Sequence, residues 1–209
     1  MLFCSYFSGQ SFHDRETYYI YGMNDFIAVD FETGMRTPSS VVSIGLVKYQ
    51  NFQLVDTYYS LIRPPELYIR PDFTEIHGLT VEDVKNAPTF TCIWDDIKSF
   101  IANYLLAAHN ANFDMRVFKA VLECYGIVIP KLQYFCTCDL ARQTWPDMAS
   151  HSLSNLANEF GIIYKAHNAL DDAITCGKLV QMSVEKLGKK KTLKGFLRAA
   201  GIRMNVMRP

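Results

Sequence analysis

The change of hydrophobic pattern at Pro64-Pro65 constrains the fold of this chain more than any other feature. Before it, three segments alternate apolar with polar residues and are joined by short connections, which is typical of an antiparallel meander. These segments are residues 26–32, 41–49 and 54–62. After it, helical periodicities alternate with short apolar runs such as Leu105–Ala108. The sequence therefore predicts an α/β fold, with a mixed central sheet flanked by helices.

Apolar residues spaced by three or four predict four helices in the second part of the chain. They are expected around residues 93–104, 113–125, 153–160 and 169–180. Gly126 and Gly161 follow two of these segments, as glycine commonly does at the end of a helix. Asn168 is a good N-cap for the last one.

Length and composition indicate one globular domain. A chain of 209 residues is large enough to bury most of its surface on folding. No apolar run approaches the ~20 residues needed to cross a bilayer, and the first residues lack the pattern of a signal peptide. The six cysteines show no paired CxxC spacing, so reduced thiols are the simplest interpretation. We therefore expect a cytoplasmic protein with no membrane partner.

The net charge of zero conceals an uneven distribution. Residues 185–209 contain eight basic residues and one acid, Glu185, which gives this segment +7 and leaves −7 for the rest of the chain. Such a basic tail could contact phosphate groups. It could equally be a solvated, cation-rich helix end that interacts with the helix dipole.

Two acids share one face of the first predicted strand. Ile27, Val29 and Phe31 lie on one side of residues 26–32, which leaves Asp30 and Glu32 together on the other. Acids beside a core need a partner, and a hard divalent cation is one such partner. The alternative is an edge strand with a solvated face.

Three further acids stand at the starts of predicted helices. Asp114 alone is consistent with a residue that interacts with the helix dipole or caps the helix. Asp171 lies three residues after Asn168 and can complete an arrangement like a capping box. Asp172 lies one residue further and has no such structural explanation.

Taken together, three motifs in order carry a resemblance to a known family. VDFET at 29–33, AHNANFD at 108–114 and HNALDDA at 167–173 resemble the DEDDh 3′→5′ exonucleases of the DNA polymerase III epsilon (DnaQ-like) type. The similarity extends over roughly residues 25–183 and includes EIHGLT at 75–80. It implies an RNase H-like fold with an exonuclease domain at 23–184. Residues 1–22 would be an extension of uncertain status, since Met23 is a possible natural start, and residues 185–209 the basic tail.

The same resemblance implies a role for each residue that matches a motif. It implies four acidic ligands for two Mg²⁺ or Mn²⁺ ions, namely Asp30, Glu32, Asp114 and Asp172, with His167 as the base. It also implies that four residues line the terminal nucleotide, namely Thr33, His77, Asn110 and Phe113.

The chemistry of phosphodiester hydrolysis agrees with these residue types. Two divalent ions can neutralise charge at phosphorus and stabilise both the attacking and the leaving oxygen. Oxygen ligands favour Mg²⁺ or Mn²⁺, and the sequence has no suitable cluster of His or Cys residues for zinc. Histidine is the side chain best suited to accept a proton near neutral pH. Three residues of the motifs also have structural interpretations: His77 could shape a turn before Gly78, Phe113 could be a core residue alone, and His109 is expected to be structural.

The function implied is removal of nucleoside 5′-monophosphates from the 3′ end of single-stranded nucleic acid. DNA is favoured over RNA because EIHGLT and HNANFD look epsilon-like, and a DNA polymerase that binds the basic tail is a possible partner. The alternatives are an exoribonuclease of the same family, an inactive nucleic-acid-binding or polymerase-associated module, and a phosphohydrolase acting on nucleotides. Gly34-Met35 departs from the Thr-Thr-Gly of many relatives, so the contact with the sugar is not predicted.

Overall fold

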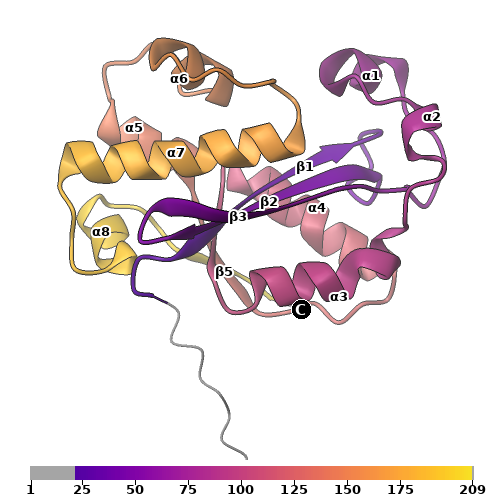
Figure 1. Ribbon diagram of the computed structural model, residues 1–209, viewed down its shortest axis with the longest axis horizontal. Coiled ribbons are helices and arrows are strands. Elements are labelled where there is room, and N and C mark those ends of the chain that lie inside the picture. Colours follow the sequence, from indigo (N-terminus) through magenta and orange to yellow (C-terminus); the bar gives the residue numbers. More distant parts are fainter. Residues whose placement is uncertain (1–21, 209) are drawn as a thin grey trace, which may run out of the picture.

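The structure, a computed structural model, describes residues 22–208 (Figure 1). The expected N-terminal extension therefore lies outside the described residues except for Gly22. Among the described residues, no helix is both long and apolar enough to cross a membrane.

A sheet of six strands forms the centre of the molecule, in the order β3-β2-β1-β4-β5-β6. The strands are β1 (Phe26–Thr33), β2 (Val41–Gln50), β3 (Gln53–Leu61), β4 (Leu105–Ala108), β5 (Leu132–Cys136) and β6 (Asn205–Met207). The first three pair antiparallel, β4 and β5 run parallel to β1, and β6 is antiparallel to β5. The mixed sheet with an antiparallel meander is thus confirmed.

Eight helices are present in the described part of the chain. They are α1 (Pro71–His77), α2 (Val81–Val84), α3 (Phe90–Ile101), α4 (Ala111–Cys124), α5 (Thr137–Thr144), α6 (Leu153–Glu159), α7 (Ala169–Leu187) and α8 (Leu193–Ala199). The four predicted helices correspond to α3, α4, α6 and α7. Tyr104, which we placed on the first of them, lies instead after its end and leads into β4.

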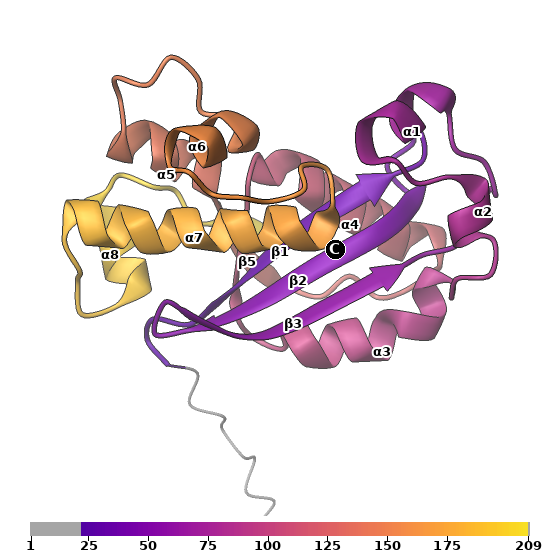
Figure 2. The same ribbon diagram turned by 45° about the horizontal axis from the view of Figure 1, so that its top comes forward.

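Helices cover both faces of the sheet (Figures 1 and 2). Ile27, Val29 and Phe31 pack against α3 and α4 on one face, and Phe26 and Ala28 pack against α7 and α8 on the other. β1 is therefore a central strand, and the interpretation of its acids as the solvated face of an edge strand is wrong.

Two glycines let α7 approach the sheet closely. Gly45 of β2 pairs with Asp30, and a Cβ atom at Gly45 would lie 2.2 Å from the carbonyl oxygen of Ala169. Further along, a Cβ atom at Gly177 would lie 2.1 Å from the ring of Tyr49, whose hydroxyl donates to the carbonyl oxygen of Ile174 at 3.0 Å. The first turn of α7 is thus held directly over the end of β1.

The expected basic tail is part of the fold. α8 buries Leu193, Phe196 and Leu197 against the α7 side of the sheet, and β6 pairs with β5. The charge of this segment obscured its apolar residues, which recur at helical spacing between the lysines.

Candidate active site

The end of β1 carries two acids into a crowded environment. Asp30 and Glu32 are partly buried, and both neighbours of each are buried. Burial raises the pKa of Asp30 well above its usual value, and the charges of Asp114, Asp172 and Glu32 raise it further. For the same reasons, burial first and then the nearby Asp172 and Asp114, the pKa of Glu32 rises to about 8.

Asp114 lies in the first turn of α4 and is 1% exposed. Among the described residues, neither of its carboxylate oxygens has a hydrogen-bond partner. Burial raises its pKa to about 8. The backbone amides of Asp114 and Phe31 lie close enough to oppose this rise, although neither makes a hydrogen bond of good geometry to the carboxylate. Burying a carboxyl group without a partner is costly, so this position indicates a site arranged for a cation.

The N-terminus of α7 presents the fourth acid. The Asn168 side chain accepts a hydrogen bond from the Asp171 amide at 3.2 Å, which confirms Asn168 as the N-cap. The predicted capping box is wrong, because the Asp171 carboxylate accepts instead from the amide of Lys165, at 3.0 Å. Asp172 is 7% exposed, and burial raises its pKa to about 7.

His167 stands beside these acids on the loop before α7. It is exposed and has a φ of 59°, which is uncommon for a residue other than glycine. One ligand atom from each of Glu32, His167 and Asp172 lies within 4.8 Å of the others. The structure thus brings together an imidazole and carboxylates that are far apart in the sequence.

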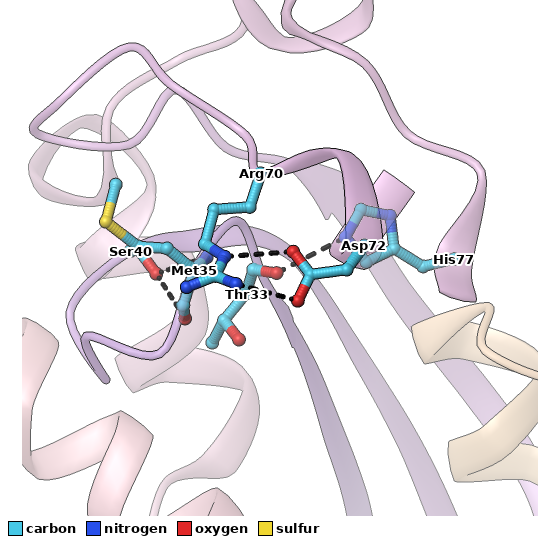
Figure 3. A network of polar contacts seen from close by, with 6 residues as sticks. All are labelled: Thr33, Met35, Ser40, Arg70, Asp72 and His77. Carbon is cyan, nitrogen blue, oxygen red and sulfur yellow. Dashed lines mark hydrogen bonds and ion pairs between the residues drawn. The ribbon is translucent and has the colours of Figure 1, made fainter. Parts of the chain in front are cut away.

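His77 connects α1 to the end of β1 (Figure 3). It is 5% exposed, and its Nδ1 atom accepts a hydrogen bond from the amide of Leu79 at 3.0 Å. This contact assigns the ring proton to Nε2, which donates to the carbonyl oxygen of Thr33 at 3.2 Å. Burial lowers the pKa of His77, which favours this neutral form. Both ring nitrogens are therefore engaged, and the contact of Nε2 holds the backbone of Thr33 in position.

The connection between β1 and β2 is anchored in the same region, as Figure 3 shows. The amide of Gly34 donates to the carbonyl oxygen of Ser40 at 2.7 Å, and the Ser40 hydroxyl contacts the backbone of Met35 at 3.1 Å. Arg70 donates twice to Asp72, at 2.9 and 3.0 Å. The amide of Arg70 donates to the carbonyl oxygen of Gly34 at 2.9 Å, so Arg70 and Ser40 together fix the backbone of Gly34 and Met35.

A hollow of about 340 Å³ opens over the acids, between α1, α4, α6 and α7. Most of the predicted site residues line it: Asp30, Glu32, Thr33, His77, Phe113, His167 and Asp172. Asp114 lies buried behind them, where its charge raises the pKa of Asp30. Asn110, in the left-handed conformation at the start of α4, lines an adjoining groove.

Six further residues line the hollow that the sequence did not indicate. They are Phe73, Ile76, His109, Ser152, Leu153 and Ser154, and Phe31 of β1 is a seventh. Ile76 is 50% exposed, and an exposed apolar residue cannot be distinguished from a core residue by its type alone. The sequence feature that could have identified Ile76 as a site residue is its position next to His77 in the EIHGLT segment.

The adjoining groove has a volume of about 700 Å³ and continues from the hollow, because His109, Ser152 and Leu153 line both. His109 forms the wall between them. Its Nδ1 atom lies 3.0 Å from the Thr137 hydroxyl, and its Nε2 atom lies 2.8 Å from the carbonyl oxygen of His151. Burial lowers the pKa of His109 to about 4, so this imidazole is neutral at physiological pH.

Comparison with known proteins gives consistent results. The Exonuclease family matches residues 27–180. The chain is 32% identical over 167 residues to a PolC-type DNA polymerase III of Thermotoga petrophila, and 30% identical over 171 residues to the 3′-5′ exonuclease DinG of Staphylococcus aureus. These matches cover 78% and 80% of this chain, but only 12% and 19% of the two relatives.

Solved structures share the fold. Exonuclease X in complex with 5′-overhanging duplex DNA matches with a TM-score of 0.63 and 25% identity, over 79% of this chain and 95% of that one. The nuclease domain of 3′hExo, described as a DEDDh family member bound to rAMP, matches with a TM-score of 0.67 and 14% identity, over 87% of this chain and 96% of that one.

Proposed function

The chain belongs to the Exonuclease family, and on this premise we propose that it removes nucleoside 5′-monophosphates from the 3′ end of single-stranded nucleic acid, with DNA preferred over RNA. The observation that carries the proposal is the meeting of four acids and one histidine from three distant segments. Burial raises the pKa of each of the four acids, and repulsion from others of the four raises the pKa of Asp30, Glu32 and Asp114 further. Such groups are a mark of functional sites.

The acids fit a pair of divalent cations. The buried carboxylate of Asp114 lacks a partner among the described residues, and oxygen donors dominate the site, a combination that suits Mg²⁺ or Mn²⁺. Asp30, Glu32, Asp114 and Asp172 would hold the two ions. When bound, these ions would neutralise the charge of the attacked phosphate and stabilise the entering and leaving oxygens.

The protein's own side chains would orient the substrate and move a proton. His167, exposed at the mouth of the site, would accept a proton from the attacking water. The new bond joins the water oxygen to phosphorus, and the bond from phosphorus to the 3′ oxygen of the preceding nucleotide breaks. Phe113 offers an aromatic surface for the terminal base, and the backbone held by His77 would position the sugar. Asn110 was expected to line the terminal nucleotide, but it lines the adjoining groove and not the hollow, so we assign it to the next nucleotide in this proposal.

The preference for DNA rests on the relatives. The PolC-type relative is a DNA polymerase, and the Exonuclease X structure contains duplex DNA. Exoribonuclease activity is the alternative, since the 3′hExo nuclease domain has the same fold and is bound to rAMP. A DNA polymerase as partner and a cytoplasmic location remain predictions.

A labelled oligonucleotide assay tests the proposal. With 5′-labelled single strands of DNA and RNA, in Mg²⁺ or Mn²⁺, we expect ladders that shorten by one nucleotide, and faster shortening of DNA. Folded protein that leaves both strands at full length would refute the proposal. Faster cleavage of RNA would reverse the assigned preference.

Neighbouring aspartates provide a matched control for the site. Asp172→Asn should lower the rate by at least about 100-fold, because it removes an acid from the cluster. Asp171→Asn should keep most of the activity, because within residues 22–208 that carboxylate accepts a hydrogen bond only from the Lys165 amide. Equal losses in the two variants would contradict the assignment of Asp172.

His167 requires a separate test of its role. His167→Ala should lower kcat by about 10²- to 10⁴-fold, as expected for a general base, while the stabilisation of the protein by Mg²⁺ persists. If the variant lost that stabilisation instead, His167 would be a metal ligand rather than the base.

A further inference from the structure

A cationic surface lies at the end of α7 opposite the candidate active site. We define the C-terminal basic surface by Lys189, Lys190, Lys191, Lys194 and Arg198, all of which are exposed. The ion pairs among residues 22–208 all lie elsewhere, so none involves these five side chains. Lys194 donates to the neutral Gln133 side chain at 2.7 Å, and Lys189 lies 5.5 Å from the centre of the Phe52 ring.

The helix dipole does not explain this concentration of charge. Favourable interaction with a helix C-terminus is confined to the last turn. Lys186 lies in the last turn of α7 and Arg198 in the last turn of α8. The dipole does not account for the lysines, because Lys189, Lys190 and Lys191 lie between the two helices and Lys194 lies in the first turn of α8. The five residues of the surface come after α7 ends at Leu187. Since the chain outside residues 185–209 carries −7, the surface is also the main concentration of positive charge. Such a surface indicates a polyanionic ligand.

Two hollows lie between the site and this surface, on either side of α5. The groove beyond His109 is lined by Arg142 of α5, whose guanidinium donates to Asp139 at 2.7 Å and so neutralises the acid in this groove. The next residue, Gln143, lines a further hollow of about 310 Å³ together with Lys190. A path from the acids to the basic surface would thus run across α5. Figure 1 shows α8 at the end of α7 that is distant from α1.

We propose that a strand whose 3′ end occupies the candidate active site continues through the groove and over α5, and that the C-terminal basic surface holds phosphates of its 5′ part. This inference rests on the proposed function. A positively charged surface that follows the backbone is how single strands are bound without sequence preference. The residues from Asp172 to Leu187 span about 22 Å of helix, so a dinucleotide cannot reach both ends.

Neutralisation of two lysines tests the inference against a matched control. Lys190→Gln with Lys191→Gln removes two charges from the surface. Arg63→Gln with Lys98→Gln removes two from exposed residues at and near α3, which packs on the opposite face of the sheet from α8. The substrates are a dinucleotide and a strand longer than about 16 nucleotides, both with a free 3′ end. The measurement is kcat/KM for each substrate at two salt concentrations.

We expect the surface variant to lose much of the preference for the long strand, and the control variant to retain it. Each lost phosphate contact lowers the salt slope by about 0.7 for a single strand. The loss should therefore be about sevenfold larger at about 50 mM than at about 200 mM salt. Gln143→Glu, which places a negative charge on the path, should reduce the preference in the same direction.

The outcomes separate the two proposals. If the wild-type protein hydrolyses neither substrate, the proposed function fails. If it hydrolyses both and the surface variant keeps its full preference for the long strand at low salt, the strand does not follow the proposed path. A surface that binds an acidic protein instead of the strand would give this result. If the two double variants lose the preference equally, the surface has no special role and the inference is overturned.

Discussion

Asp114 is the residue whose surroundings point most directly to a cation. Asp114→Asn replaces a buried carboxyl group that has no partner among the described residues with a neutral amide. We expect the metal-free variant to be more stable than the wild type by about 1–2 kcal/mol, measured by urea denaturation with a chelator present. Mg²⁺ should raise the melting temperature of the wild type and have a much smaller effect on the variant. A metal-free variant that is less stable would show that the carboxylate has a stabilising partner.

His109 gives a pH dependence that is separate from the acids. Its pKa falls from 6.5 to about 4 on folding, chiefly through burial. Between these values the unfolded chain binds a proton that the folded protein does not. The stability contributed by the neutral imidazole is therefore complete above pH 6.5 and is lost as the pH falls towards 4.

His109→Gln isolates this effect, because glutamine does not titrate. The difference in unfolding free energy between wild type and variant should shrink by about 3 kcal/mol between about pH 7 and about pH 4. Denaturation of both proteins in the same buffers measures it. A difference that stays constant with pH would mean that the folded protein binds the proton as readily as the unfolded chain.

For individual residues, the sequence alone was enough to assign some roles and not others. Asp171 and Asp172 could be separated because Asn168 fixed the start of the helix, and the structure gives them different surroundings. The actual partner of Asp171 could not be predicted, since the Lys165 amide reaches it only through the path of the loop. Ile76 was missed because an exposed apolar residue and a core residue look the same in a hydrophobic pattern.

At the scale of elements, the position of α7 decides whether the acids meet. Gly45→Ala would place a Cβ atom 2.2 Å from the carbonyl oxygen of Ala169, so the first turn of the helix must move. We expect a loss of about 1–3 kcal/mol in stability and a larger loss in activity, because Asp172 moves with that turn. Melting temperature and kcat would measure the two effects.

Gly195→Ala is the matched control for this substitution. Its new Cβ atom would meet only the Thr192 hydroxyl, at 3.0 Å, in α8 away from the site. Wild-type activity in Gly45→Ala would show that the contact between α7 and β2 does not position the acids.

Long periodic elements could be predicted and short ones could not. α3, α4 and α7 each present an apolar face over several turns, which is a strong signal. α2 has only four residues, and β6 only three, so neither gives a detectable period. Both depend on tertiary contacts, such as the pairing of β6 with β5.

At the scale of the whole molecule, the segment after residue 184 completes the core rather than extending from it. Leu197 is fully buried in the cluster that contains Phe26 and Phe135. Leu197→Ala should lower the free energy of unfolding by about 2–5 kcal/mol. The exposed Arg203→Ala should change it by no more than about 0.5 kcal/mol. Equal stability of the Leu197→Ala and Arg203→Ala variants would show that the fold does not depend on this segment. A chain ending at residue 184 that is as stable as the full chain would lead to the same conclusion.

The topology could be predicted because it follows from the order of patterns. A meander followed by helix-strand units leaves few arrangements of a mixed sheet. Charge composition was a poorer guide, since eight basic residues concealed the apolar residues of α8. Net charge informs on binding partners and solubility, and not on whether a segment is packed.

The length of α7 has a kinetic consequence for the proposed path. One rigid helix separates the acids from the basic residues by about 22 Å, and that separation is the same for every substrate. A long strand would remain attached at both places through successive cleavages and dissociate rarely. Once shortened below this span it would be held at its 3′ end alone. Degradation would then change from processive to distributive, and oligonucleotides of a few residues would accumulate before the final mononucleotides.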